Sequence, residues 1–114
     1  MVIKCSKKAY FVENTIKMSG GDWKAMFKGV QDNDLELVRF YINAGIDLNY
    51  QHPEYVALPL SESIRYNHLQ IAELLLSHGA KASIIEIESG VSPLDLARKR
   101  GNKEAVDLLK RFNQ

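Results

Sequence analysis

The sequence predicts an all-α solenoid in which helix pairs stack side by side, and three observations carry this prediction. First, residues 92–112 read as a helix, a glycine turn and a second helix. Second, the same pattern recurs upstream at a step of 34 residues. Third, a helix pair of about twenty residues is too short to bury its own apolar face, so it has to stack on a similar unit.

The segment at residues 92–112 carries the clearest helix signals. Ser92 can accept a backbone N–H at a helix start, and Pro93 suits the first helical position, where its missing N–H is not needed. Asp95 follows three residues after Ser92, close to a capping-box position. We expect this helix to end at Gly101. A second helix should follow, with an apolar side made of Ala105, Val106, Leu108, Leu109 and Phe112.

Upstream segments repeat this pattern in phase. Residues 58–63 align with residues 92–97, and Asn67 aligns with Gly101. One step earlier, residues 33–38 align with 67–72, and residues 43–45 align with 77–79. A fixed step of this size indicates a repeat array. The expected helices of the earlier units are 23–30, with Asp22 as a possible cap, 35–43, 59–66 and 69–77.

These recurring segments resemble the ankyrin repeat, whose pattern is T-P-L-H-x-A, then G-H, then L-L-x-x-G-A-D-V-N. The segments that carry the resemblance are Ser92–Ala97, Gly101-Asn102, Leu74–Ala80 and Gly45–Asn49. It covers about residues 22–112 as three repeats. The resemblance implies an ankyrin-type solenoid of stacked helix-turn-helix repeats with projecting hairpin loops.

The departures from the ankyrin pattern are as informative as the matches. The step is 34 residues, against the usual ~33. In the first repeat, residues 24–27 read Lys-Ala-Met-Phe where the motif should stand, so this repeat resembles a degenerate capping unit. In the second repeat, Leu58 replaces the Thr and Ser61 replaces the His, which weakens the local hydrogen-bonding pattern.

The chain is expected to divide into two parts. Residues 1–21 lack the repeat phase and form a short N-terminal extension, which we expect to cover the open end of the stack. A partner-binding arm is the alternative interpretation of this segment. Residues 22–114 form the ankyrin-type domain, with repeats at about 22–55, 56–88 and 89–114.

Composition limits the class of protein. A length of 114 residues suits one domain, and 46% apolar with 25% charged residues is ordinary for a folded domain. No apolar run approaches the ~18–20 residues of a membrane span, and the first residues lack the apolar core of a secretory signal. Cys5 has no second cysteine with which to form a disulfide. We therefore expect a cytoplasmic protein that does not contact a membrane.

Motifs for catalysis are absent from the sequence. His52, His68 and His78 lack metal-ligand spacing, and the resemblance gives His68, at the G-H position, a structural role. There is no phosphate-binding loop and no G-x-S-x-G motif. The basic run at residues 98–103 has acidic neighbours and no interleaved aromatic residue. We expect no enzyme activity, no cofactor, no metal and no nucleic-acid partner.

Charge is distributed unevenly along the chain. Residues 32–62 are acidic, with Arg39 as their one Lys or Arg, whereas residues 98–111 are mainly basic. This polarity favours an oriented encounter with a charged partner. Solvated faces of amphipathic helices are the alternative explanation.

The second predicted hairpin, residues 79–91, alternates isoleucine and glutamate. Ile85 and Ile87 fall near the tip, where ankyrin repeats usually carry polar residues. Exposed apolar side chains on a projecting loop indicate an interaction site. Alternatively, these isoleucines fold back onto the residue that the 34-residue step adds to the loop, or onto the neighbouring hairpin.

The predicted function is non-catalytic recognition of another protein through the concave face and the hairpin tips. By resemblance, the binding positions are Gln31, Asp32, Gln51, Pro53, Glu54, Tyr55, Arg65, Tyr66, Ile85, Ile87, Glu88, Lys99 and Arg100. Among these, Tyr55, Arg65 and Tyr66 are expected to form the energetic centre.

Two other functions remain open at this point. The chain is small enough to be an inhibitor or immunity protein that neutralises one enzyme or toxin. It is also a candidate for a self-associating structural subunit. We expect a monomer, with dimerisation through a repeat edge or the loop of Ile85 and Ile87 as the alternative.

Overall fold

The structure is a computed structural model that describes residues 20–112, and this part of the chain folds as three helix-turn-helix pairs without a strand. The predicted all-α fold is confirmed. The expected extension at residues 1–21 lies, up to residue 19, outside the described residues. The helices are α1 (Gly20–Gln31), α2 (Leu35–Asn43), α3 (Pro59–Arg65), α4 (Leu69–Ser77), α5 (Pro93–Lys99) and α6 (Lys103–Phe112).

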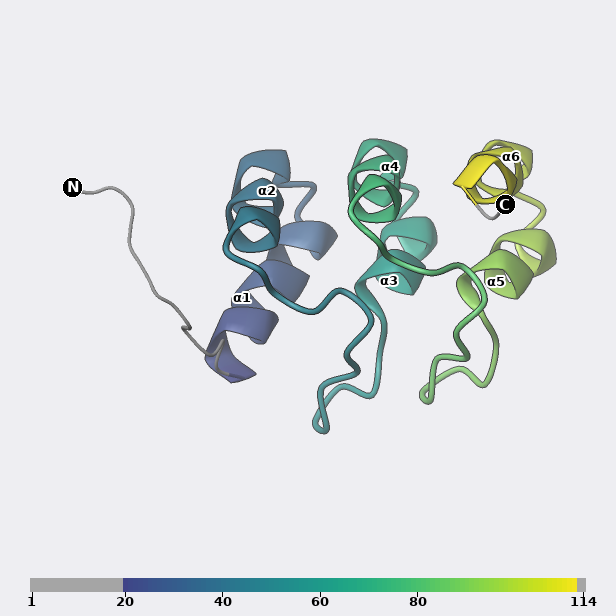
Figure 1. Ribbon diagram of the computed structural model, residues 1–114. Coiled ribbons are helices and arrows are strands. Elements are labelled where there is room, and N and C mark those ends of the chain that lie inside the picture. Colours follow the sequence, from purple (N-terminus) through teal and green to yellow (C-terminus); the bar gives the residue numbers. More distant parts are fainter. Residues whose placement is uncertain (1–19, 113–114) are drawn as a thin grey trace.

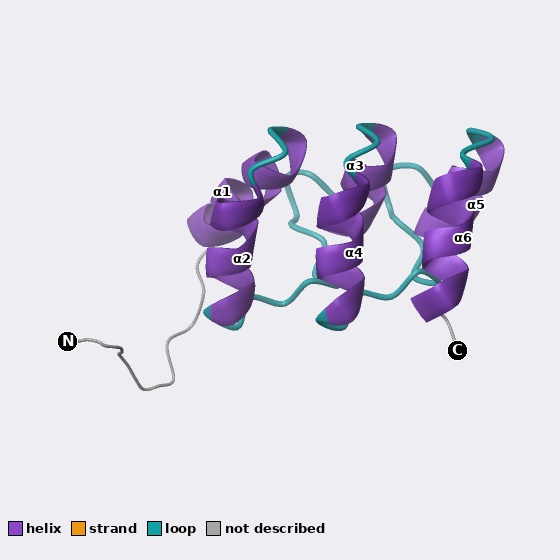
Figure 2. Cartoon of the chain, turned by 90° about the horizontal axis from the view of Figure 1, so that it is seen from above, coloured by secondary structure: helices purple, strands orange, loops and turns teal. Residues whose placement is uncertain are grey.

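The helices lie in two rows (Figure 1). One row contains the inner helices α1, α3 and α5, and the other contains the outer helices α2, α4 and α6. Two loops project on the side of the inner row: the first hairpin, residues 44–58, and the second hairpin, residues 78–92. Seen from above, the three pairs follow one another along the long axis (Figure 2) of a molecule that measures 46 × 27 × 26 Å. We call the side formed by the inner helices and the hairpins the inner face.

The turn within each pair has the same backbone geometry. Asn33, Asn67 and Gly101 have positive φ angles of 59°, 58° and 67°. Glycine and, among the other residues, asparagine adopt this left-handed conformation most readily. The 34-residue step therefore places a suitable residue at every turn. The expected helix bounds agree to within one or two residues except in α1, which begins at Gly20 and so contains Asp22 in its first turn instead of being capped by it.

The inner helices α3 and α5 both begin with a proline at their first position. At α5, the Ser92 hydroxyl accepts the Asp95 N–H at 3.2 Å, as the sequence predicts. At α3, the capping position is Leu58, which has no side-chain acceptor. The Leu58 N–H instead donates to the carboxylate of Glu86 at 2.9 Å. At α3, the acceptor for a backbone N–H of the helix start thus comes from the second hairpin, whereas at α5 it comes from the capping residue itself.

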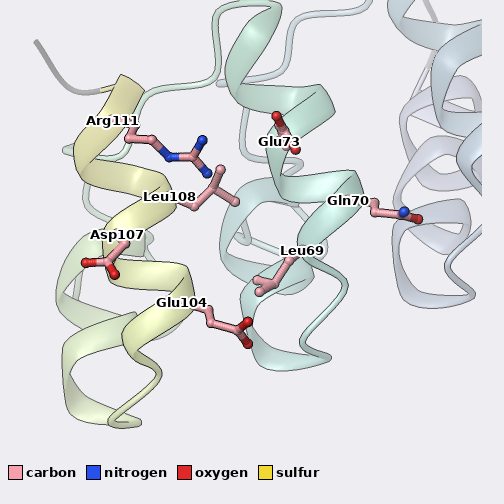
Figure 3. A pocket seen from close by; sticks show the side chains of 7 residues that line it. All are labelled: Leu69, Gln70, Glu73, Glu104, Asp107, Leu108 and Arg111. Carbon is pink, nitrogen blue, oxygen red and sulfur yellow. The ribbon is translucent and has the colours of Figure 1, made fainter.

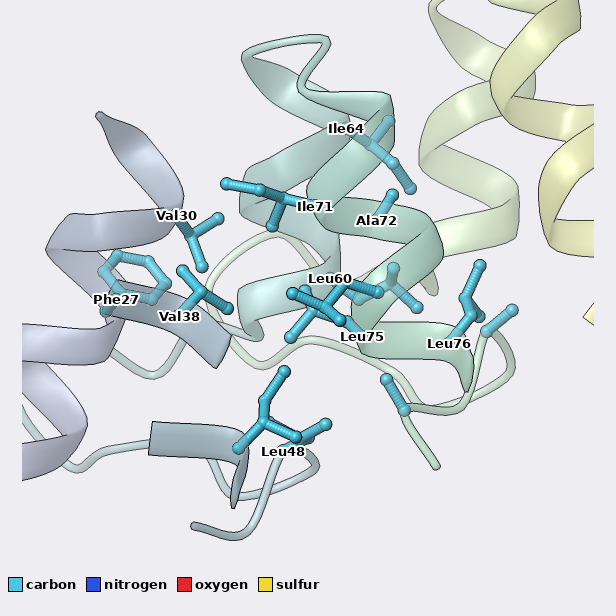
Figure 4. Packing of buried hydrophobic residues seen from close by; sticks show 14 of the residues in the cluster. Phe27, Val30, Val38, Leu48, Leu60, Ile64, Ile71, Ala72, Leu75 and Leu76 are labelled. Atoms are coloured by element: carbon cyan, nitrogen blue, oxygen red, sulfur yellow. The ribbon is translucent and has the colours of Figure 1, made fainter. Parts of the chain in front are cut away.

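One cluster of buried apolar side chains extends from α1 to α6. Figure 4 shows its part between α1 and α4. The apolar side of α1 is buried, and it consists of Trp23, Met26, Phe27 and Val30. Most of α4, which lies between α2 and α6, is buried as well. Polar contacts join neighbouring units as well: the Nδ1–H of His68 donates to the Val30 carbonyl at 2.9 Å, which gives His68 the structural role expected of it. Each fully buried Leu or Ile contributes roughly 1.5–3 kcal/mol to folding, so every unit depends on its neighbours.

Candidate functional site

Two amide side chains fasten the hairpins to each other. Gln51 in the first hairpin donates to the Ile85 carbonyl at 2.9 Å and accepts the Ile87 N–H at 2.7 Å. Asn49 makes the same pair of bonds to the backbone of residues 79–81, at 3.1 and 3.0 Å. The two loops therefore hold a fixed position relative to one another. Gln51, expected as a binding residue, uses its amide for this contact.

Aromatic residues hold the first hairpin on α1. The indole N–H of Trp23 donates to the Tyr50 carbonyl at 3.2 Å. His52 is buried against Trp23, with 5.4 Å between the ring centroids. The His52 Nδ1 accepts the Glu54 N–H at 3.1 Å, which closes the tip of the loop. Tyr55 then meets Trp23 edge to face, at 5.5 Å.

A cation from this chain already stands beside Tyr55. The Lys24 ammonium lies 6.0 Å from the centroid of the Tyr55 ring, and it forms an ion pair with Glu54. The hydrogen bond and the attraction of Glu54 raise the pKa of Lys24 above its ordinary value. The same contact with Lys24 lowers the pKa of Glu54. Tyr55 and Glu54, both predicted binding residues, therefore have Lys24 of this chain as their positively charged neighbour.

A buried ion-pair network crosses the inner face. Glu86 is 0% exposed, and both of its carboxylate oxygens accept hydrogen bonds from the Arg65 guanidinium. Arg65 also donates to Glu62 at 2.8 Å, and Glu62 accepts a bond from the Gln31 amide at 2.7 Å. The network joins α1, α3 and the second hairpin, and it includes the contact of Glu86 with the start of α3.

This network changes the interpretation of Arg65. Burial alone would lower the pKa of the guanidinium, but its hydrogen bonds with Glu86 and Glu62 and their charges outweigh burial and raise it. Two carboxylates thus meet the charge of Arg65, which was expected to be a central binding residue. Its main contribution to the inner face is to hold Glu86 and Glu62 in place.

An open hollow of about 510 Å³ lies between the hairpins and the inner helices; its lining residues are Phe27, Gln31, Tyr55, Ala57, Glu62, Arg65 and Glu88. It brings together four of the predicted binding residues, namely Gln31, Tyr55, Arg65 and Glu88. Phe27 and Glu62 also line the hollow, although neither was among the binding positions predicted from the sequence. The i,i+3 spacing of Glu62 and Arg65 on one helix was the signal that could have revealed their pairing.

The other predicted binding residues lie around the hollow and not in it. Tyr66 caps α3 and is 51% exposed. Ile85 and Ile87 are 54% and 64% exposed, so the alternative that their side chains fold back is wrong. Pro53, Lys99 and Arg100 are also exposed; the Arg100 guanidinium donates to the Arg65 carbonyl at 3.2 Å. Asp32 is exposed beside Lys28, its ion-pair partner at 3.2 Å.

A second depression, of about 420 Å³, lies between the outer helices α4 and α6 (Figure 3); its lining residues are Leu69, Gln70, Glu73, Glu104, Asp107, Leu108 and Arg111. Leu108 and Arg111 point toward α4, whereas Gln70 and Asp107 point away from the space between the helices. No aromatic residue and no predicted binding residue lines it. The hollow on the inner face is therefore the candidate site.

Residues 20–112 contain neither a metal-binding cluster nor a membrane-spanning helix. In this range, no group of three or more His, Cys, Asp and Glu side chains is placed to hold a metal ion. None of the helices in the same range is long and apolar enough to cross a membrane.

Comparison with known proteins points to one family. The family model for ankyrin repeats in three copies matches residues 23–113. Over 78 residues, the chain is 36% identical to a Fowlpox virus protein named for its ankyrin repeats, which covers 68% of this chain and 23% of the viral protein. It is 33% identical over 86 residues to a palmitoyltransferase of Lachancea kluyveri, and 34% identical over 77 residues to the human 2-5A-dependent ribonuclease.

These likenesses extend over a small part of each relative. The chain spans 11% of the palmitoyltransferase and 10% of the ribonuclease, while the matches cover 75% and 68% of this chain. The likeness is thus one of repeats and carries no enzyme activity with it. Ankyrin repeats generally bind other proteins and are generally not catalytic. With its model matched over residues 23–113 and its helix pairs stacked as described, the chain belongs to the ankyrin repeat family.

Proposed function

We propose that this chain is a non-catalytic module that binds a partner protein through the concave inner face and the tips of its hairpins. The observation that carries the proposal is the exposure of Ile85 and Ile87 on a hairpin whose backbone is held by Gln51. Exposed apolar side chains on a projecting, fixed loop are typical of interaction sites. The neighbouring hollow adds the aromatic ring of Tyr55 to the same surface.

Rigidity favours binding here for a physical reason. Association costs free energy when loops and side chains become ordered, so a surface that is already ordered loses less. The amide contacts of Asn49 and Gln51 order the two hairpins before any partner arrives. Aromatic and apolar anchors such as Tyr66 and Ile87 then supply most of the binding energy.

The distribution of charge supports a narrower version of this function. Arg98, Lys99 and Arg100 are exposed at the end of α5, whereas Glu54 and Glu88 are exposed on the hairpins. Opposite charges at separate places orient a partner and speed its capture. Neutralisation of one enzyme or toxin would benefit from such capture. Stoichiometric addition of this chain should then abolish the partner's activity.

Self-association is the alternative that the same exposed side chains support. Ile85 and Ile87 would then contact a second copy of the chain. Light scattering over a range of concentrations separates the two functions. A mass that rises with concentration and becomes constant in an Ile85→Ser, Ile87→Ser variant favours the structural subunit, and a constant monomer mass contradicts it.

The test of the proposed function is affinity capture from lysate of the native host with the full chain, followed by mass spectrometry. The binding variant is Tyr66→Ala combined with Ile87→Ser. Phe40→Ala is the matched control, because Phe40 is a similarly exposed apolar side chain on the outer helix α2. We expect one main partner that the binding variant loses and the control retains. Equal capture by all three proteins would contradict the inner face as the binding surface.

A further inference from the structure

The hollow on the inner face combines an aromatic wall with an excess of negative charge. Tyr55 forms its exposed side, and Phe27 packs edge to face against Tyr55 at 5.3 Å. Glu62 and Glu88 contribute carboxylates to the lining, and Glu86 lies directly behind Arg65. The three glutamates carry three negative charges and Arg65 carries one positive charge, so this group of four side chains has a net charge of −2.

Among the residues that line the hollow, Glu88 has a carboxylate that is available to a ligand. Its N–H donates to the Val56 carbonyl at 2.8 Å, which fixes the backbone beside the hollow. Its carboxylate is exposed and has no hydrogen-bond or ion-pair partner among residues 20–112. Glu62, by contrast, is held by Arg65 and Gln31. The hollow therefore offers one positioned carboxylate and one unpaired carboxylate next to an aromatic ring.

We propose that this hollow receives an arginine side chain from the partner protein, which rests on Tyr55 and donates to Glu88. The inference rests on the proposed function and names the chemistry of the partner. A guanidinium is planar, so it can stack on an aromatic ring while its edge donates to a carboxylate. It is also less strongly hydrated than an ammonium, which lowers the cost of entering a partly buried site.

The contact between Lys24 and Tyr55 supports the choice of a cation. The Lys24 ammonium stands 6.0 Å from the ring centroid and is held there by Glu54. The ring thus already attracts a positive group on one side within this chain. The outer hollow between α4 and α6 carries carboxylates as well, but it has no aromatic ring and its Arg111 points into the space between the helices. The outer hollow therefore serves as the control site, with carboxylates but without the aromatic ring.

The first experiment uses small probes on the full chain. Acetyl-arginine amide is titrated into the labelled protein and followed by amide chemical shifts, with acetyl-citrulline amide as an uncharged probe of the same shape. We expect saturable shifts at Phe27, Tyr55 and Glu88, and an affinity on the order of 5- to 10-fold weaker for citrulline. Equal binding of the two probes would overturn the proposal. Equal binding of acetyl-lysine amide would overturn the choice of arginine.

Two substitutions locate the probe. Glu88→Gln removes the unpaired carboxylate and should weaken arginine binding by roughly 2- to 5-fold. Glu73→Gln makes the same change on the outer face and should leave the affinity unchanged. Both carboxylates are exposed, so both variants should fold, and their unfolding curves verify this. An identical affinity in the Glu88 variant would contradict the assigned site.

A second experiment separates this inference from the proposed function. A random peptide library is selected on the full chain, and the selected peptides are tested against the Glu88→Gln and Tyr66→Ala variants. Peptides that contain arginine and bind less well to the Glu88 variant support the inference. Peptides that depend on Tyr66 but contain no arginine keep the proposed function and overturn the inference. Peptides that neither variant weakens overturn both.

Discussion

The helices α3 and α5 occupy the same place in successive repeats but begin in different ways. At α5, Ser92 accepts an N–H of its own first turn, so the stabilising contact is local. At α3, Leu58 offers no acceptor, and the carboxylate of Glu86 reaches its N–H from the following hairpin. A carboxylate at this end also interacts favourably with the helix dipole. The same requirement of the backbone is thus met once by a residue of the same helix start and once by a residue 28 positions along the chain.

Leu58 departs from the repeat pattern at the start of α3, and the contacts that compensate for it connect α3 to other parts of the stack. Glu86 is held by Arg65, Arg65 also binds Glu62, and Glu62 binds Gln31 of α1. Helix α3 therefore depends on the second hairpin and on the end of α1. At the start of α5, the Asp95 N–H is met by Ser92 and the Leu94 N–H by the Ala82 carbonyl, and both acceptors precede the helix in the same stretch of chain. Perturbations of the two helix starts should accordingly differ in size.

The largest loss of folding stability is expected from Glu86→Ala. It leaves the Leu58 N–H without its acceptor and Arg65 without its bidentate partner. Because Arg65 is partly exposed and keeps Glu62, we expect a loss of roughly 2–4 kcal/mol in the free energy of unfolding, measured with urea. Glu88→Ala is the control, since that exposed carboxylate has no partner in the described structure and its loss should cost little. Equal effects of the two variants would refute a structural role for Glu86.

A smaller effect is expected from Ser92→Ala. It removes the hydroxyl that accepts the Asp95 N–H, and the loss of a helix cap of this kind costs about 1 kcal/mol. The measurement is again urea unfolding, with Ser83→Ala as the control on an exposed loop position. If Ser92→Ala cost as much as Glu86→Ala, the contrast between a local and a distant cap would not hold.

Substitution of Ser61 is expected to stabilise the fold, in contrast to the two changes above. Ser61 stands where the ankyrin pattern has a histidine. The Ser61 hydroxyl is buried and, among the described side chains, it has no hydrogen-bond partner, whereas Asp95 at the same place in the next repeat is exposed. A buried hydroxyl without a partner costs free energy. Ser61→Ala should therefore raise the free energy of unfolding by about 0.5–1 kcal/mol. Destabilisation in the urea curve would mean that the hydroxyl is hydrogen-bonded in solution.

The same distinction between local and distant contacts explains how much the sequence could reveal. Signals within one turn were sufficient for the helices, as the Ser92-Pro93 start and the asparagine and glycine turns show. The repeat step then fixed which helices stack. The ion-pair network was not predictable in this way, because Glu86 lies between two isoleucines in a loop and the pattern gives no sign that the glutamate points inward.

Backbone conformation at the hairpin ends was also beyond the sequence pattern. Val56 and Gly90 stand one repeat step apart and both have positive φ angles, of 46° and 75°. Glycine adopts this conformation freely, but a β-branched residue does so only under strain. A valine at this position would have argued against the left-handed turn, and only the packing of the surrounding hairpin reveals it. Four residues that line the candidate site, Gln31, Tyr55, Arg65 and Glu88, were predicted from the sequence as binding positions, whereas the partners of Arg65 were not.

The smallest contribution to folding stability is expected from the exposed pair of Lys24 and Glu54. This pair contrasts with that of Arg65 and the buried Glu86. The Lys24 hydrogen bond and charge lower the pKa of Glu54. A lowered pKa in the folded state means that the pair stabilises the fold above the pKa of the unfolded carboxyl, about 4.3. This stabilisation disappears as the pH falls through the lower pKa of the folded state.

A carboxyl-detected NMR titration can test this pair directly. The midpoint of Glu54 should lie below its ordinary value and should move upward in the Lys24→Gln variant, which removes the hydrogen bond and the charge of Lys24. Salt should produce the same upward shift in the unsubstituted chain, because exposed charges are screened. A Glu54 midpoint that ignores both the substitution and the salt would mean that the two side chains do not meet in solution. The hairpin tip would then depend on the buried contacts of His52 and Trp23 alone.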